Sequence, residues 1–191
     1  MTSIFKRIFF QRDPENVALD LLGTKLVRKF DLQIFEGMIV ETEAYYGEKD
    51  PASRAYNGLK FYNKAMWSLP GNLFIYNVHK YWMFNIVAHY PNEVGAVLIR
   101  AVEPLTGIEE MMKNRQIDDI YQLTNGPGKL TIAFNIDNSL NEIDITSEKS
   151  RIHIVKYKTD FKIASSKRIG VKKDLKRNMR FFIDSNRYVS K

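Results

Sequence analysis

The sequence predicts a single α+β domain that occupies residues 1–191. A chain of 191 residues suits one domain, and its 45% hydrophobic and 13% aromatic residues are enough for a buried core. Short segments that alternate apolar and polar residues are interspersed with short helical segments. Neither an internal repeat nor a low-complexity linker divides the chain, so we expect one continuous core.

The first predicted helix begins after Asp13. Asp13-Pro14-Glu15 combines an N-cap carboxylate, a proline at the first helical position and an acid near the positive end of the helix dipole. Gly23 is expected to end this helix as its C′ residue. The apolar stripe that should face the core consists of Val17, Ala18, Leu21 and Leu22.

Most of the remaining chain is predicted to form strands. In order, the expected strands are residues 25–30, 32–45, 73–76, 81–88, 94–103, 151–158 and 179–183. Asp31 should join the first two tightly, and residues 77–80 form the expected turn between the third and fourth. Two further helices are predicted, over residues 105–116 and from Gly126-Pro127 to Phe134.

The positive charge is concentrated near the C-terminus. Residues 1–148 contain 15 Lys and Arg against 19 Asp and Glu, whereas residues 149–191 contain 14 against 3. A basic segment on a mildly acidic body is typical of proteins that bind a polyanion, and we expect nucleic acid as the partner. The alternatives are a basic surface that only contacts solvent, and an anionic membrane. The membrane is less favoured because residues 151–158 alternate like a strand.

Composition excludes several classes of site. The chain has no cysteine, which removes disulfides and thiolate metal sites and fits a reducing cytoplasm. Its three histidines lack metal-ligand spacing, so neither a metal nor a cofactor is expected. No apolar run approaches the roughly 20 residues of a membrane span. The first ten residues also lack the apolar core of a secretory signal.

The most informative stretch is IVETEAYYG, residues 39–47. On a strand Glu41, Glu43 and Tyr45 share one face, while Val40 and Thr42 face the other way. Two carboxylates and an aromatic ring at the end of a buried strand could bind and stack a flat polar ring. The alternative is a solvated edge strand whose charges prevent pairing with other chains.

Other residues could contribute to the same site. Arg100 lies within an apolar strand and must be paired, with Glu103 or another neighbour, or functional, because an unpaired buried charge is very costly. Lys129, in Gly126-Pro127-Gly128-Lys129, could bind a phosphate at a helix start. Tyr76 could equally be a core residue, and Asn85 could serve only a turn or a strand edge.

Together these segments resemble the alkyladenine (3-methyladenine) DNA glycosylase family. The resemblance runs in order through DPENVALDLLGTKL, IVETEAYYG, PGNLFIY, GAVLIRAVEP, NGPGKL, Arg168-Ile169-Gly170 and RFFI at residues 180–183. It implies an α+β fold with a curved, mostly antiparallel β-sheet, flanking short helices and a protruding β-hairpin.

The resemblance also implies a monofunctional enzyme of base excision repair. Such an enzyme flips a damaged purine of the 3-methyladenine, 7-methylguanine or hypoxanthine type out of duplex DNA and hydrolyses its N-glycosidic bond, leaving an abasic site. Glu43 corresponds to the general base and Arg100 to an arginine that helps to hold the water, whereas Glu41 is not catalytic. Tyr45 and Tyr76 would sandwich the base, and Asn85 would exclude the amine of guanine.

Two departures from the family pattern bear on the site. Arg54 stands where the family usually has a histidine against the flipped base, which predicts a shift from cationic lesions toward neutral ones such as hypoxanthine. At the hairpin tip the family intercalates a tyrosine, whereas this chain has His79-Lys80. His79 is therefore the expected wedge, with Val78 as the competitor.

The expected partner is double-stranded DNA that contains damaged purines. We expect phosphate contacts from Lys80, Lys129 and Arg168, and a cytoplasmic monomer without an obligatory protein partner. A non-catalytic nucleic-acid-binding β domain is the alternative. A carbohydrate hydrolase that uses Glu41 and Glu43 as its acid pair is disfavoured, because both acids lie on one strand rather than across a scissile bond.

Overall fold

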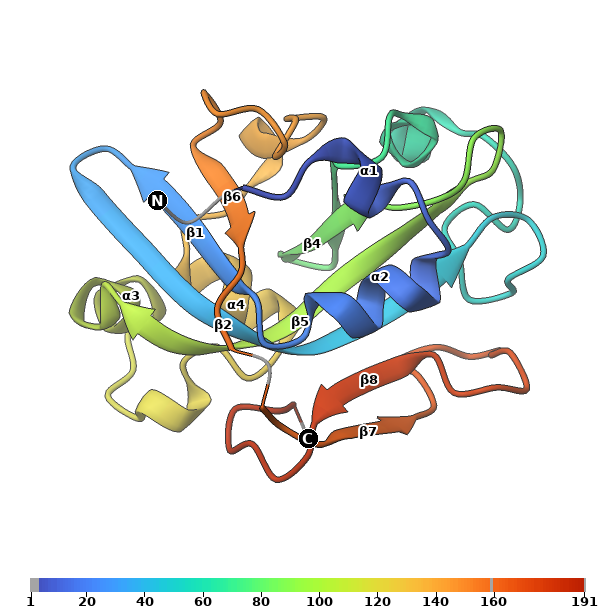
Figure 1. The fold of residues 1–191 in the computed structure, drawn as a ribbon. Coiled ribbons are helices and arrows are strands. Elements are labelled where there is room, and N and C mark those ends of the chain that lie inside the picture. Colours follow the sequence, from blue (N-terminus) through green and yellow to red (C-terminus); the bar gives the residue numbers. More distant parts are fainter. Residues whose placement is uncertain (1–3, 159, 191) are drawn as a thin grey trace.

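The computed structural model describes residues 4–158 and 160–190. Its centre is an eight-stranded antiparallel sheet that curves around the core (Figure 1). The main path has the strand order β3-β4-β5-β2-β1-β6, and β7 and β8 extend the sheet beside β2. The strands are β1 (Lys25–Phe30), β2 (Gln33–Tyr46), β3 (Leu73–Val78), β4 (Tyr81–Val87), β5 (Gly95–Thr106), β6 (Ile152–Val155), β7 (Ile163–Ser166) and β8 (Arg180–Ile183).

Strand β2 is the centre of the sheet and has three partners. Its first half pairs with β1, almost all of it pairs with β5, and Glu41–Glu43 pairs with β8. The two glutamates therefore lie between β5 and β8 with no free edge. The alternative of a solvated edge strand is therefore excluded, since both carboxylates are fully buried.

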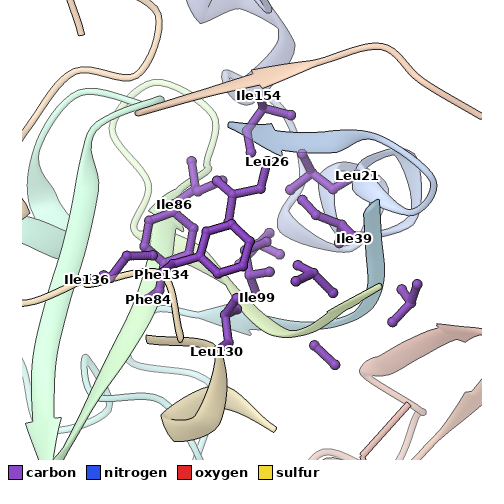
Figure 2. Packing of buried hydrophobic residues seen from close by; sticks show 14 of the residues in the cluster. Leu21, Leu26, Ile39, Phe84, Ile86, Ile99, Leu130, Phe134, Ile136 and Ile154 are labelled. Carbon is purple, nitrogen blue, oxygen red and sulfur yellow. The ribbon is translucent and has the colours of Figure 1, made fainter. Parts of the chain in front are cut away.

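Helices cover the sheet and complete the core. They are α1 (Arg7–Phe10), α2 (Pro14–Leu21), α3 (Ile108–Arg115) and α4 (Pro127–Ala133), with 3-10 segments at Phe61–Trp67, Ile120–Gln122 and Asn138–Leu140. Helix α2 packs on β2 and β5, and α4 packs on β4 and β5. Figure 2 shows part of the resulting core, in which Leu21 of α2 and Phe134 at the end of α4 belong to the same cluster as strand residues Ile39, Phe84 and Ile99.

The local signals at both helix starts are confirmed. The Asp13 carboxylate accepts a hydrogen bond from the Glu15 N–H at 2.8 Å, Pro14 is the first helical residue, and Gly23 follows the helix with φ 73°. The other predicted start is confirmed as well, because α4 begins at Pro127 after Gly126.

Several predicted boundaries are wrong. The strand expected over residues 151–158 ends at Val155. Strand β5 continues to Thr106, which pairs with Glu36 of β2, so the helix expected from residue 105 begins only at Ile108, after Gly107 turns the chain with φ 80°. The hairpin of β3 and β4 is tighter than expected. Val78 pairs with Tyr81, which leaves only His79 and Lys80 in the turn.

Candidate active site

A cavity of about 640 Å³ lies beside the C-terminal half of β2. Loop residues 51–54 and 169–173 form part of its wall, together with Pro127 at the start of α4. Six of the residues predicted for the site line it: Tyr45, Arg54, Tyr76, Val78, Asn85 and Arg100. Residues from β2, β3, β4 and β5 thus come together in one cavity, as the sequence predicted.

Glu43 lies at this cavity without any exposed surface. Its Oε1 accepts a hydrogen bond from the Ile169 N–H at 2.8 Å, and its Oε2 accepts one from the Tyr45 hydroxyl at 2.7 Å. Arg100 Nη1 lies 3.2 Å from Oε1. Because Ile169, Tyr45 and Arg100 all line the cavity, the carboxylate lies directly behind its wall.

Burial raises the pKa of the Glu43 carboxyl above its ordinary value. Desolvation is the largest cause, and the charge of Glu41 adds to it; Arg100, the Ile169 N–H and the Tyr45 hydroxyl act in the opposite direction without cancelling it. A carboxylate with a raised pKa is a stronger base than an exposed one, which suits a group that must accept a proton from water.

Glu41 has a different environment, although it shares the face of Glu43. Its Oε1 accepts hydrogen bonds from Arg100 Nε at 2.9 Å and from Arg180 Nε at 2.7 Å. Ser190 donates both its N–H and its hydroxyl to this carboxylate, each at 2.7 Å. These donors occupy both oxygens, so Glu41 holds Arg100 and the C-terminal segment in place.

Two adjacent bulges aim Arg100 at the glutamates. Val40 of β2 and Arg100 of β5 lack a partner in the β2–β5 register, where Ile39 pairs with Val102 and Thr42 with Ile99. A bulge re-aims a side chain, and bulges are frequent beside active sites. The suggested structural pair of Arg100 with Glu103 is not formed, because Glu103 accepts a hydrogen bond from Asn186 and Arg100 contacts Glu41 and Glu43 instead.

The rings of Tyr45 and Tyr76, which both line the cavity, have different neighbours. The Arg168 guanidinium lies 4.5 Å from the centroid of the Tyr45 ring, and burial together with Glu43 raises the pKa of Tyr45, which stays a neutral donor. Phe74 stacks on Tyr76 with ring centroids 4.9 Å apart, and the Arg54 guanidinium lies 4.8 Å from the Tyr76 centroid. The face of Tyr76 under Arg54 is therefore already covered.

The amide of Asn85 is held in one orientation. Its Nδ2 donates to the carbonyls of Phe74 at 3.0 Å and Met83 at 3.1 Å. Both donor hydrogens are used by the backbone, so the group that Asn85 can present to the cavity is its carbonyl oxygen.

The residues expected to touch DNA lie in different settings. Val78 lines the cavity, whereas His79 and Lys80 are exposed in the hairpin turn, where His79 has a φ of 54°. Lys129 is half-buried and donates to Asn125 Oδ1 at 2.7 Å. Which of His79 and Val78 enters DNA stays a prediction.

The predicted phosphate contact of Arg168 is wrong. Its side chain has no exposed surface, and its guanidinium is bound by Asp50 at 2.7 Å and Asp174 at 2.6 Å. A phosphate could not reach this group without breaking two ion pairs. Lys172 and Lys173, which follow Arg168 in the same loop, do line the cavity.

Sequence reasoning missed four contributors: Asp50, Ile169, Arg180 and Ser190. Asp50 contributes by binding Arg168 across 118 residues of chain, and Ile169 contributes through its backbone, which no residue type signals. Among the described residues, no group of three or more His, Asp or Glu could hold a metal ion, and no helix is long and apolar enough to cross a membrane.

Comparison with known proteins assigns the family. The model of the methylpurine-DNA glycosylase (MPG) family matches residues 8–187. Proteins named "Putative 3-methyladenine DNA glycosylase" match nearly the whole chain. The one from Staphylococcus saprophyticus is 37% identical over 96% of this chain and 92% of its own length. That from Clostridium tetani is 39% identical over 97% and 98%, and that from Rhizobium etli 40% identical over 97% and 88%.

These matches confirm the predicted family and enzyme class. The match of the family model extends from α1 to beyond β8, so it includes every strand of the sheet and the whole cavity. The chain therefore belongs to the methylpurine-DNA glycosylase family and is a hydrolase of N-glycosyl bonds that acts on DNA.

Proposed function

We propose that this enzyme excises damaged purines from duplex DNA with a water molecule activated by Glu43. The observation that supports this most is a buried carboxylate with a raised pKa, held behind the cavity wall between Arg100 and the Ile169 N–H. Glu43 takes the proton of the water as it attacks the anomeric carbon of the sugar. Its charge stabilises the oxocarbenium-like transition state, and the bond to the purine nitrogen breaks.

The flipped purine occupies the cavity between Tyr45 and Arg54, because Arg54 covers the face of Tyr76 that was expected to stack on the base. Tyr45 offers an aromatic ring, and Arg54, lying on Tyr76, offers a planar guanidinium that stacks well on a flat base. Asn85 faces the base edge and leaves no room for the exocyclic amine of guanine. Base stacking of this kind contributes about 1–3 kcal/mol and offsets part of the cost of flipping.

Arg54 shifts the preference toward neutral lesions. Burial by itself lowers the pKa of Arg54, but Tyr76 and the neighbouring Tyr62 and Tyr45 raise it overall, so the side chain stays charged. A fixed positive charge beside the base repels a cationic purine such as 7-methylguanine and tolerates a neutral one such as hypoxanthine.

The DNA lies across the mouth of the cavity. Lys172 and Lys173 line the cavity, and Lys80 and Lys129, each two residues along the chain from a lining residue, Val78 and Pro127, supply further positive charge. His79 or Val78 at the hairpin enters the helix where the nucleotide leaves it.

Duplexes that each carry one defined lesion test this function. Incubation with the protein is expected to release the free base and leave an alkali-labile abasic site in duplexes with hypoxanthine or an alkylated purine. The undamaged duplex should stay intact. The alternative, a non-catalytic binding domain, would retain the damaged duplex without cleaving any glycosidic bond.

A further inference from the structure

Arg168 fastens the loop between β7 and β8 to the loop that follows β2. Its Nη1 and Nη2 donate to the two oxygens of Asp50, each at 2.7 Å, and Nη1 also donates to the Ala44 carbonyl at 2.9 Å. Its Nε donates to Asp174 Oδ1 at 2.9 Å. The guanidinium therefore connects two segments that are 118 residues apart in the chain.

Both acidic partners are fixed by the backbone. The buried Asp50 accepts hydrogen bonds from the Tyr46 N–H at 3.0 Å and the Ala52 N–H at 3.1 Å. Asp174 accepts from the N–H groups of Arg168 at 3.1 Å and Leu175 at 2.8 Å. Because each carboxylate has its own backbone donors, the position of Arg168 is determined within a small range. Paired, hydrogen-bonded charges of this kind are the ones that a buried site tolerates.

Arg168 controls the two hydrogen-bond donors of Glu43. The next residue, Ile169, donates its N–H to Glu43 Oε1, and the guanidinium lies on the Tyr45 ring whose hydroxyl donates to Glu43 Oε2. One side chain that never touches the carboxylate thus orders one donor for each of its oxygens.

We propose that Arg168 is a positioning residue for the catalytic base, holding Ile169 and Tyr45 so that Glu43 keeps its charge and its direction toward the cavity. This inference rests on the proposed role of Glu43. This role explains why Arg168 is buried although it lies in the most basic stretch of the loop. Arg168 acts on the chemical step through geometry and not through a contact with the phosphate.

Loss of Arg168 should change the pH dependence of excision. The ionisable groups that face Glu43 are Arg100 from β5, Glu41 and Tyr45 from β2, and Tyr76 from β3. Hydrogen bonds from Ile169 and Tyr45 favour the ionised carboxylate, so loosening them raises the pKa of Glu43 further. The acidic limb of the excision rate then moves to higher pH, and the rate falls while DNA binding changes little.

Arg168→Lys and Arg168→Gln test this role against the matched control Arg28→Lys. Arg28 is an equally buried arginine, in β1 and away from the cavity. Both Arg168 variants should lose roughly 10- to 100-fold in single-turnover excision, because small displacements of catalytic groups cost that much. Their acidic limbs should move to higher pH with lesion-DNA Kd nearly unchanged. Arg28→Lys should lower at most the melting temperature and keep the acidic limb of the native protein.

Asp174→Asn provides a milder variant, because Asp174 is partly exposed and the Asp50 pair remains. It should move the acidic limb of the excision rate to higher pH, but by less than the Arg168 variants do. Native limbs and rates in Arg168→Lys and Asp174→Asn would overturn the proposal, as would a loss in Arg168→Lys that is equal at every pH and matched by Arg28→Lys.

A titration of the Glu43 carboxyl by carbon-13 NMR gives a readout that does not need activity. The pKa of Glu43 should be higher in Arg168→Lys than in the native protein, and an unchanged pKa would contradict the inference. The two failures are distinguishable. A native protein that releases no base refutes the proposed function, whereas an active native protein with unaffected Arg168 variants refutes only the role of Arg168.

Discussion

Arg100 binds Glu41 and Glu43 at once, with its Nε donating to Glu41 Oε1 at 2.9 Å and its Nη1 3.2 Å from Glu43 Oε1. One guanidinium is thus shared between two buried carboxylates from alternate positions of one strand. Arg180 and Ser190 provide further donors, but all of them to Glu41. Glu41 is the fully satisfied carboxylate, and Glu43 is the one whose charge is compensated incompletely.

The rate of base release should depend on the protonation of Glu43. Burial raises its folded-state pKa, so the rate is expected to rise with pH through a value above the ordinary glutamate pKa of about 4.3. Single-turnover rates from pH 4 to 9 measure this limb. A limb at or below the ordinary value would show that Glu43 is not the titrating base.

Glu43→Gln should stabilise the protein at neutral pH. A carboxyl whose folded-state pKa is raised contributes its full stability below the unfolded pKa, and this contribution is lost as the pH rises through the folded pKa. Glutamine resembles the protonated form, so the variant should melt above the native protein near pH 7.5 and close to it near pH 4.5. A melting temperature below the native value at pH 7.5 would contradict this.

Glu41→Gln should destabilise the fold strongly. It weakens the contacts of two nearly buried guanidinium groups, Arg100 and Arg180, and breaking a buried ion pair in this way costs about 3–5 kcal/mol. Asp20→Asn is the matched control, because it removes an exposed pair with Arg12 that is worth only about 0–1 kcal/mol. Urea unfolding of both variants compares the two losses, and equal losses would contradict the structural role of Glu41.

Arg54→His should change lesion preference more than overall folding. Replacing a fixed charge with a mostly neutral imidazole removes repulsion of a cationic base, so the ratio of 7-methylguanine to hypoxanthine excision should rise roughly 10-fold, equivalent to about 1.4 kcal/mol. The ratio of single-turnover rates on matched duplexes measures the effect. A ratio equal to that of the native protein would refute the selectivity of Arg54.

Lys80 and Lys129, each two residues along the chain from a residue that lines the cavity, should account for part of the salt dependence of DNA binding. Lys80→Ala and Lys129→Ala are each expected to weaken binding on all sequences and to reduce the slope of log K against log salt by about 1. Lys113→Ala, on α3 and paired with Glu110, is the control that should leave the slope unchanged. Unchanged slopes in both Lys80→Ala and Lys129→Ala would place the DNA elsewhere.

The sequence predicted the features that depend on neighbouring residues. Asp13-Pro14 and Gly126-Pro127 start helices through their own backbone chemistry, and alternation located β1, β2 and the hairpin strands. The helix predicted from Leu105 failed because pairing of β5 with β2 outweighs local helix propensity at Leu105 and Thr106.

The surroundings of the site depend on contacts between distant segments. Pairing of β8 with Glu41–Glu43 buries both acids, and only the folded chain brings Asp50 to Arg168 or Ser190 to Glu41. The sequence therefore predicted that the basic loop binds phosphate through Arg168, although in the folded chain Arg168 forms ion pairs with two aspartates. The family resemblance supplied the identity of the cavity residues, but it could not show that Arg54 lies on Tyr76.

Whether Glu43 is the base is tested by single-turnover release of hypoxanthine from a defined duplex, measured for the native protein and for Glu43→Gln. Glu36→Gln, at the far end of β2 beside Lys25, is the control. Glu43→Gln is expected to bind the lesion duplex with near-native affinity and to release base at least roughly 100-fold more slowly, at the lower end of the 10²–10⁴-fold range of general base catalysis. Base release by Glu43→Gln at the rate of the native protein and of Glu36→Gln would contradict the account.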